Sequence, residues 1–309
     1  MKTVYSVVVP VHNEAANLSE LVRRMTAVLD ALGEAWELVI VDDGSTDEST
    51  RIIREVAQQD RRVRPVILAR SFGHQIAITA GWDFARGDAV IVADGDLQDP
   101  PEVIPELVRK WKEGYEVVYG VRRERRGETW FKKSTATLFY RLLRRLTEVP
   151  IPADVGDFRL MDRRVVDVLK RMKEHHRFPR GMSAWVGFRQ AAVAYTRDAR
   201  ARGESKYRFR RMARLATTAI TGFSSAPLRL ATLLGFLSTG AALVCAPFVL
   251  VARASHPASF LAAFAGWIPI FFLGGIQLIC IGILGEYIGR LYDEARGRPL
   301  YVVREAPED

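Results

Sequence analysis

The sequence predicts an α/β fold, in which a mainly parallel, doubly wound sheet is followed by an apolar part suited to a membrane. Runs of β-branched residues alternate with helical patterns over the first half of the chain, an order typical of parallel sheets. Leu230–Gly285 is mostly apolar, whereas everything before about Arg211 is charged and mixed. We therefore expect a sheet domain at 1–210, an interfacial helix and linker at 211–229, a transmembrane hairpin at 230–289 and a cytoplasmic tail at 290–309.

Short apolar runs bounded by turn residues give the strands of this sheet. The first should stop at Pro10, and the helix after it carries Leu18, Leu21, Val22, Met25, Val28, Leu29 and Leu32 on one face. A further helix is expected over Gln75–Ala85, and a strand-like stretch with Trp185 and Phe188 lies within Gly181–Tyr195. The predicted strands are Val4–Val9, Trp36–Val41, Val63–Leu68, Ala89–Ala93 and Val117–Gly120.

Acidic residues follow two of the predicted strands. Asp42 and Asp43 end the second strand, and Asp94, Asp96 and Asp99 follow the fourth. Open α/β sheets bind ligands at the carboxyl ends of their strands, so both groups should share one edge. Magnesium takes one or two protein carboxylates and completes its shell with phosphate and water. The pattern favours a Mg²⁺ or Mn²⁺ site that also holds a diphosphate, with an acidic surface turn as the alternative.

Composition restricts the partners and the compartment. The 309 residues carry a net charge of +9, which suggests anionic partners such as nucleic acid, acidic lipids or phosphorylated substrates. The two cysteines, Cys245 and Cys280, lie in the apolar part and support neither a disulfide framework nor a zinc site. Val4–Val11 is too short for a secretory signal, so we expect the N-terminal part to stay in the cytoplasm.

The apolar part contains two stretches of membrane-spanning length, Leu230–Ala252 and Phe260–Gly285. Two buried core helices are the alternative. An amphipathic helix over Arg211–Phe223 should lie in the membrane interface. Arginines before the first span and after the second place both ends in the cytoplasm. The helix predicted at Thr129–Leu146 is basic and amphipathic, and could equally lie on the membrane or on the core.

Three motifs carry a family resemblance. The segments Val8–Glu14, Val41–Asp47 and Ala93–Pro101 resemble glycosyltransferase family 2, of GT-A fold. Further on, Gly156–Leu160 and Gly203–Tyr207 resemble the polyprenyl-phosphate glycosyltransferases, which include dolichol-phosphate mannose synthases and bactoprenol glucosyltransferases. One departure is Ser71, where many members carry Asn. His74, close by, is left without a role, and we interpret it as a packed or capping histidine.

The resemblance implies a nucleotide-sugar site. Pro10, Glu14 and Asp42 would line the nucleotide, Asp94 would lie near the ribose or sugar, and Gln98 close to the sugar or metal. Asp96, together with Asp94, would hold the metal on the diphosphate and so act in catalysis. For Glu14, a charge favoured at a helix N-terminus is an equal alternative.

The resemblance also implies an acceptor side. Asp157 would be an essential catalytic carboxylate that positions the acceptor, binds metal or takes a residual proton; the alternative is an Asp in a turn that pairs with Arg159. Arg122 opens a charge run that follows a strand edge near the proposed diphosphate, so it would clamp phosphate; a solvated surface charge is the alternative. Arg202 and Lys206 flank Gly203 in a segment that could close over the diphosphate and the lipid phosphate, or could simply contact the membrane.

These expectations define an inverting enzyme of the inner, cytoplasmic membrane, multi-pass, with its catalytic domain in the cytoplasm. It would move a hexose to undecaprenyl or another polyprenyl phosphate, from UDP-glucose as first choice and GDP-mannose as second, with Mg²⁺ or Mn²⁺ and without nucleic acid. Pro299–Val303 is strand-like and could pair with another subunit's sheet edge in a homo-oligomer.

Two rival classes remain. A flippase or transporter for the lipid-linked sugar is disfavoured by two short spans without intramembrane charges. A dinucleotide-binding oxidoreductase is disfavoured because Pro10–Glu14 lacks the glycine fingerprint.

Overall fold

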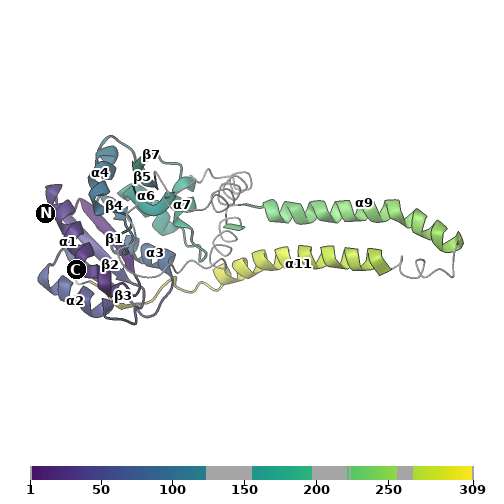
Figure 1. Ribbon diagram of the computed structural model, residues 1–309, viewed down its shortest axis with the longest axis horizontal. Helices are drawn as coiled ribbons and strands as arrows, with labels where there is room; N and C mark the ends of the chain where they lie inside the picture. The colour runs from purple at the N-terminus through teal and green to yellow at the C-terminus, as the bar shows by residue number, and fades with distance from the viewer. Residues whose placement is uncertain (1, 123–154, 197–220, 223, 256–266, 308–309) are drawn as a thin grey trace. The chain divides into compact units, whose positions relative to one another are not determined.

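The computed structural model describes residues 2–122, 155–196, 221–222, 224–255 and 267–307 (Figure 1). They fall into two compact units. The first holds the sheet and takes in the last part of the chain from Pro299, and the second holds the long apolar helices. Each unit is considered by itself.

The first unit is built on an eight-stranded sheet with the order β7-β5-β6-β4-β1-β2-β3-β8. β1, β2, β3 and β4 run parallel, as the sequence predicted. β6 is antiparallel to β4 and β5, β5 is parallel to β7, and β8 is antiparallel to β3. The strands are β1 Tyr5–Val11, β2 Trp36–Asp42, β3 Val63–Leu68, β4 Ala89–Val92, β5 Val117–Arg122, β6 Val155–Asp162, β7 Gln190–Tyr195 and β8 Val303–Glu305.

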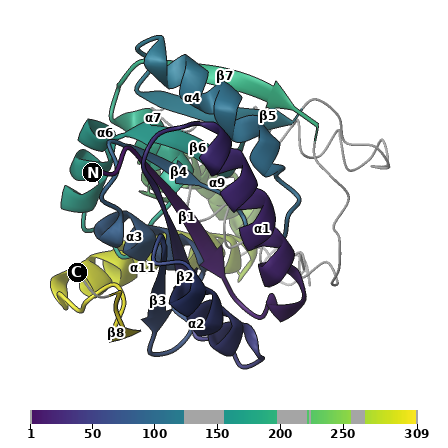
Figure 2. The same cartoon turned by 90° about the vertical axis from the view of Figure 1, so that its left-hand side faces the viewer.

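Helices cover both faces of the sheet, which is the doubly wound arrangement (Figure 2). One face carries α1 (Ala15–Ala31), α2 (Ser49–Gln59), the short 3₁₀ turn η1 (Pro101–Val103) and α4 (Ile104–Lys112). The other carries α3 (His74–Phe84), α6 (Arg163–Arg171) and α7 (Pro179–Trp185).

Helix α1 confirms the apolar face that the sequence predicted after the first strand. Leu18, Leu21, Met25 and Leu29 recur at helical spacing, and all are buried on the sheet. β1 beneath them is buried along its whole length, as expected for a central strand covered on both faces. The apolar core therefore fixes the strand ends from which the site is built.

Three sequence predictions need correction here. β1 continues through Pro10 and ends at Val11. Proline has no backbone N–H to donate, but the pairing of β1 with β4 ends at Val8, so no ladder hydrogen bond to β4 is lost at Pro10. Gly181–Trp185 is the end of α7, and the strand begins only at Gln190. Asp157 lies inside β6 rather than in a turn.

The C-terminal strand is also placed differently from the prediction. β8 pairs with β3 of the same chain, so it does not reach for another subunit here. The Arg54–Glu305 ion pair and a 2.8 Å hydrogen bond from the Tyr301 hydroxyl to Asp83 reinforce this docking. The segment predicted as a tail, 290–309, thus contains the end of α11 and the eighth strand of the sheet.

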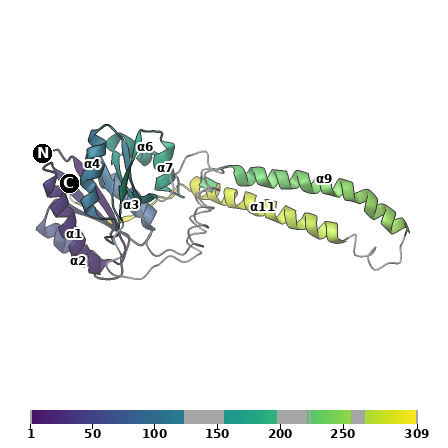
Figure 3. The same cartoon turned by 45° about the horizontal axis from the view of Figure 1, so that its top comes forward.

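The second unit consists of α9 (Ala226–Ser255) and α11 (Trp267–Ala295), which lie side by side (Figure 3). Ala226–Pro247 and Ile270–Ala295 are long and apolar enough to cross a membrane. Phe236 and Phe271 are each 74% exposed, a surface that suits lipid better than water. The second segment extends ten residues past the predicted Gly285, where an Arg290–Glu286 pair spaced one turn apart supports the helix. The helix predicted at Thr129–Leu146 and nearly all of Arg211–Phe223 lie outside the described residues.

A buried polar network ties β1, β2 and β3 together at the start of the strands. The Glu37 carboxylate accepts hydrogen bonds from the Ser6 hydroxyl at 2.6 Å, from the backbone N–H of Arg86 at 2.6 Å and from Nη1 of Arg64 at 2.9 Å. The Arg64 and Glu37 side chains are only 9% and 5% exposed, so each charge depends on the other.

Removing Glu37 should therefore destabilise the sheet unit strongly. Glu37→Ala leaves the Arg64 guanidinium buried without its carboxylate, at a cost of about 3–5 kcal/mol. The measurement is thermal unfolding of the full chain in detergent, followed by tryptophan fluorescence. Glu20→Ala is the matched control, since Glu20 pairs with an Arg23 side chain that is 69% exposed and should shift the midpoint little. Equal midpoints for the two variants would contradict the importance of the network.

Candidate functional site

The acidic groups do gather at one edge of the sheet. β1, β2 and β4 are parallel, so their carboxyl ends meet there, and the antiparallel β6 begins at the same edge. Asp42 ends β2, Asp94 lies two residues beyond β4, and Asp157 is the third residue of β6. The strand order thus brings the donor-side and acceptor-side candidates to one place.

The turns after β1 and β2 are locked together. Asn13 adopts a left-handed conformation with φ 57°, and its side-chain oxygen accepts a 2.8 Å hydrogen bond from the N–H of Thr46. Asp42 is fully buried and accepts hydrogen bonds from the N–H of Ser45 at 2.9 Å and from the Thr50 hydroxyl. In this structure Asp42 therefore shapes the turn, and its contact with a nucleotide stays a prediction.

Pro10 and Glu14 flank the same turn. Pro10 is buried in β1, and Glu14 is the residue that precedes α1. Its carboxylate accepts a 2.7 Å hydrogen bond from Asn17. This position fits the helix N-terminal charge that was the alternative for Glu14, and leaves a nucleotide contact as a prediction.

Asp43 anchors the loop that leads into α3. Its carboxylate accepts three hydrogen bonds, from the Ser71 hydroxyl at 2.8 Å, the N–H of Phe72 at 2.7 Å and the N–H of Gly73 at 3.0 Å. Ser71 thus fulfils a hydrogen-bonding role at the position where many family members carry Asn. Gly73, with φ 100°, completes the bend, and His74 follows as the first residue of the helix.

The loop after β4 is a tight turn around Asp96. The Asp96 carboxylate accepts a 3.1 Å hydrogen bond from the N–H of Gln98, and Leu97 between them has φ 58°. Gly95 packs against β1, where an added Cβ would stand 3.2 Å from the carbonyl oxygen of Pro10. The predicted residues Asp94, Asp96 and Gln98 therefore share one short loop beside β1.

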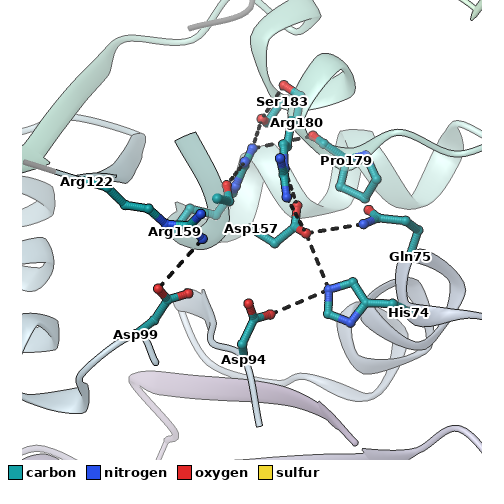
Figure 4. Close-up of polar contacts among 11 residues, drawn as sticks. His74, Gln75, Asp94, Asp99, Arg122, Asp157, Arg159, Pro179, Arg180 and Ser183 are labelled. Carbon is teal, nitrogen blue, oxygen red and sulfur yellow. Dashed lines mark hydrogen bonds and ion pairs between the residues drawn. The ribbon is translucent and has the colours of Figure 1, made fainter. Parts of the chain in front are cut away.

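Asp157 is held by cations rather than by Arg159, contrary to the turn interpretation (Figure 4). Its oxygens accept hydrogen bonds from Nε and Nη2 of Arg180 at 2.9 and 3.1 Å, and from Gln75 at 3.2 Å. Burial alone would raise the pKa of Asp157, but the charge of Arg180 and the bond from His74 hold it well below its usual range. The group is thus a fixed carboxylate.

His74 joins the two carboxylates that face it. Its Nε2 lies 3.3 Å from Oδ2 of Asp157 and 3.5 Å from Oδ1 of Asp94 (Figure 4). Partial burial opposes the charged form of the ring, yet the bond to Asp157 and the two negative charges raise the pKa of His74 to about 9. The interpretation of His74 as a packed or capping residue is therefore wrong, since its side chain is 44% exposed and paired with acids.

Arg122 closes the other side of the site, at the end of β5. It donates a 3.4 Å hydrogen bond from Nε to the Tyr195 hydroxyl, and its Nη2 lies 3.9 Å from Asp99. Tyr195 in turn donates to Asp99, whose carboxylate is buried. Gly156 makes room for Arg122, because a Cβ there would stand 2.8 Å from Nη2. These contacts tie the loop that carries Asp96 to β5 and β7.

Arg159 has a different task from the one predicted. Its guanidinium is buried and donates to the carbonyl of Gly156 at 2.8 Å and to the Ser183 hydroxyl (Figure 4). Burial lowers the pKa of Arg159 to about 10. These bonds hold α7 against β6, and α7 is the helix that presents Arg180 to Asp157.

The donor set around the loop fits a metal that is shared with a substrate. Burial, together with the nearby carboxylates, raises the pKa of Asp94 to about 6 against the opposing charge of His74. No hydrogen bond from the described residues reaches Oδ1 of Asp94. Within those residues, no group of three or more His, Cys, Asp or Glu side chains is arranged to hold a metal. One or two carboxylates completed by phosphate and water remain the arrangement that fits.

The remaining predicted phosphate ligands, Arg202 and Lys206, lie outside the described residues. The sequence did not single out Arg180, Tyr195 or the pairing of Asp99. A signal for His74 was present, since a histidine opening a helix opposes the helix dipole and needs acidic partners.

Comparison with known proteins gives the family. Residues 6–170 match the family description "Glycosyl transferase family 2". An uncharacterised glycosyltransferase of Bacillus subtilis, YkcC, is 50% identical over 306 residues, covering 98% of this chain and 94% of its own. A prophage bactoprenol glucosyl transferase homolog of Escherichia coli K12 is 38% identical, covering 97% of this chain and 98% of its own. The chain belongs to glycosyltransferase family 2, and it is a glycosyltransferase with a GT-A fold.

Among solved structures, glucosyl-3-phosphoglycerate synthase from Mycobacterium tuberculosis, in complex with Mn²⁺, UDP and phosphoglyceric acid, is a partial match. It covers 71% of this chain and 76% of its own, at 22% sequence identity and a TM-score of 0.49.

The Tyr195–Asp99 contact yields a prediction. Tyr195→Phe removes the hydroxyl that serves the buried Asp99 carboxylate, which should cost about 1–3 kcal/mol of stability. Because Asp99 follows Asp96 in the same loop, the apparent affinity for divalent metal should fall as well. Thermal midpoints and a metal titration of activity measure both effects. Tyr115→Phe is the control, since it keeps the ring that Lys110 and Arg189 cover. If Tyr195→Phe kept the metal dependence of the wild type, Asp99 would not contribute to metal binding at Asp96.

Proposed function

We propose that the protein transfers a hexose from a nucleotide sugar, with UDP-glucose as the first candidate, to a polyprenyl phosphate at the cytoplasmic face of a membrane. The observation that carries the proposal is the match over 97% of the chain to proteins named as bactoprenol glucosyl transferases, at 38% identity. Their similarity extends beyond the sheet unit and over the two apolar helices. A chain that combines a strand-edge acidic site with such helices suits one water-soluble and one lipid substrate. GDP-mannose is the second donor candidate.

The reaction forms one bond and breaks one. An oxygen of the lipid phosphate attacks the anomeric carbon while the bond from that carbon to the diphosphate breaks, and the nucleoside diphosphate leaves with the bonding electrons. Attack from the face opposite the leaving group inverts the anomeric configuration. Since the second pKa of a phosphate monoester is about 6, the nucleophile is largely ionised at neutral pH and hardly needs a base.

This chemistry assigns a positioning task to Asp157. A general base works best with a pKa near the working pH, whereas Asp157 is held well below its usual range by Arg180 and His74. Of the three roles that the sequence left open, we favour positioning of the acceptor, which the contacts of Asp157 with Arg180 and Gln75 support. Arg122 is 18% exposed and its Nη2 lies 3.9 Å from Asp99, at the end of the loop that carries Asp96, so it is our candidate for a phosphate contact.

A divalent metal, Mg²⁺ or Mn²⁺, would be held by Asp96 and Asp94. When bound, it would supply charge that stabilises the departing nucleoside diphosphate. Asp96 is nine-tenths buried in its turn, and Oδ1 of Asp94 faces His74, so we propose Asp96 as the principal ligand.

The chain connectivity supports a hairpin in the membrane. The polypeptide leaves the sheet unit after β7, runs through α9 and α11, and enters the same sheet again at β8. One folded sheet stays on one side of a bilayer, so the apolar segments between β7 and β8 cross an even number of times. Two crossings, with the sheet unit in the cytoplasm, agree with the arginines that flank the spans.

The direct test of the proposed function uses the full chain purified in detergent. It is incubated with undecaprenyl phosphate, Mg²⁺ or Mn²⁺ and each of a panel of nucleotide sugars, and the lipid product is identified by mass spectrometry. We expect a monophosphate-linked hexose from one UDP-sugar, with release of UDP. Formation of a sugar product on a water-soluble acceptor but never on the lipid would overturn the proposed acceptor.

The metal assignment makes a separate prediction. Asp96→Asn should keep the fold but lower turnover roughly a hundred-fold or more, because metal stabilisation of a leaving group is worth several kcal/mol. EDTA should silence the wild type, and Mg²⁺ or Mn²⁺ should restore it. Asp88→Asn, at the opposite end of β4, is the matched control and should stay active. Full activity in excess EDTA would refute the metal role.

The topology can be tested at Ser255, the last residue of α9. In a background with Cys245 and Cys280 replaced by alanine, a cysteine at position 255 should react with an impermeant maleimide on intact cells. A cysteine at Gln58, exposed on α2, should react only after lysis. The reverse pattern would place the sheet unit on the other side of the membrane.

A further inference from the structure

Two carboxylates at the site face each other across neighbouring strands. β4 and β6 are antiparallel, with a register that pairs Ala89 with Asp162 and Val92 with Arg159. Continued by two residues, this register sets Asp94 against Asp157. Like charges that lie directly opposite each other on antiparallel strands repel and destabilise the pair. A donor that reaches both side chains would offset this repulsion directly.

His74 lies where such a group is needed. A single atom, Nε2, is 3.5 Å from Asp94 and 3.3 Å from Asp157, so the ring spans the two carboxylates (Figure 4). Arg180 and Gln75 also contact Asp157. The His74 ring contacts both acids from a single atom. His74 is therefore the link between the loop after β4 and the beginning of β6.

The backbone fixes the ring in this place from a third strand. Asp43, directly after β2, holds Ser71, Phe72 and Gly73 by three hydrogen bonds, and His74 follows at once. Gly44 allows this approach, because a Cβ there would stand 2.5 Å from the backbone of Arg70. These contacts hold the backbone that leads into His74 independently of its side-chain contacts with the two acids.

Helix stability does not explain a histidine at this position. A positive charge in the first turn of α3 opposes the helix dipole. The side chain is 44% exposed, so it adds little to the core. A residue that breaks a local preference without a packing benefit is often retained for the site it serves.

We propose that His74 is a positioning residue for glycosyl transfer, which holds Asp94 on the donor side and Asp157 on the acceptor side at a fixed separation. This inference rests on the proposed function for its reaction, but the link itself is a property of the protein alone. His74 touches neither substrate in this role. It acts by keeping two strand ends from moving apart, so that sugar and acceptor are presented to each other in register.

The test compares His74→Gln, whose side chain is neutral, with His74→Lys, whose side chain is a cationic donor. In the full chain in nanodiscs, hydrogen–deuterium exchange should become faster in His74→Gln both at Asp94–Asp99 and at Val155–Asp157, and stay near wild type in His74→Lys. Peptides from α2 serve as the internal control. In the transfer assay, His74→Gln should lose about ten- to hundred-fold in kcat, the range expected for one charge-assisted contact. The KM for the nucleotide sugar should change less than kcat, and His74→Lys should recover much of the loss.

The outcomes separate the two proposals. Wild-type exchange and kinetics in His74→Gln would overturn the positioning role. Faster exchange with unchanged kcat would overturn its relevance to transfer. Equal damage in His74→Lys and His74→Gln would overturn the role of the positive charge. If the wild type transfers no sugar to lipid, the proposed function fails, whereas the exchange experiment still decides whether His74 links the two segments.

Discussion

Electrostatic balance at one edge of the sheet is the constraint on which the site depends. Parallel β1, β2 and β4 bring their acidic ends together, and β6 adds Asp157 to the same edge. Carboxylates at such distances stay ionised only beside cations or donors. Arg180 and His74 supply these for Asp157, and Tyr195 with Arg122 supplies them for Asp99. Each partner comes from a different element: α3, α7, β5 and β7. These helices and strands are therefore as necessary to the site as the acidic loops themselves.

Much of the fold follows from the sequence because it is encoded locally. Buried strands show as apolar runs, and α1 shows as a helical stripe. The carboxyl ends of parallel strands must share an edge, so the place of Asp94 and Asp96 at that edge could be predicted. The pairings could not, because they join distant residues: Gln75 contacts Asp157 across 82 positions, and Tyr195 contacts Asp99 across 96. Arg159 was the obvious partner for Asp157, because alternate residues of a strand share a face. In the structure its guanidinium donates instead to the Gly156 carbonyl and to the Ser183 hydroxyl, which its position along the chain does not predict.

The ionised state of Asp157 suits this residue to positioning rather than to proton transfer. A carboxylate fixed between two cations is a poor proton acceptor but a rigid support. If the acceptor is already ionised when it binds, the protein has to orient it and neutralise its charge, and proton transfer matters less. Lowering a pKa well below neutrality is therefore consistent with the chemistry of a phosphate nucleophile, whereas a hydroxyl acceptor would favour a carboxylate with a raised pKa.

The pairing of β8 with β3 also has a consequence for biosynthesis. β3 ends at Leu68, but the strand that covers its edge begins only at Val303, after both apolar helices. A ribosome adds about 5–20 residues each second, so the edge of β3 stays uncovered for roughly ten seconds or more while the rest of the chain is made. An open strand edge is a template for pairing with other chains during that interval. The last few residues of the protein thus complete its sheet only when the nascent chain has already reached its membrane segments, and premature termination near the end would release a protein with intact acidic loops and an unprotected edge.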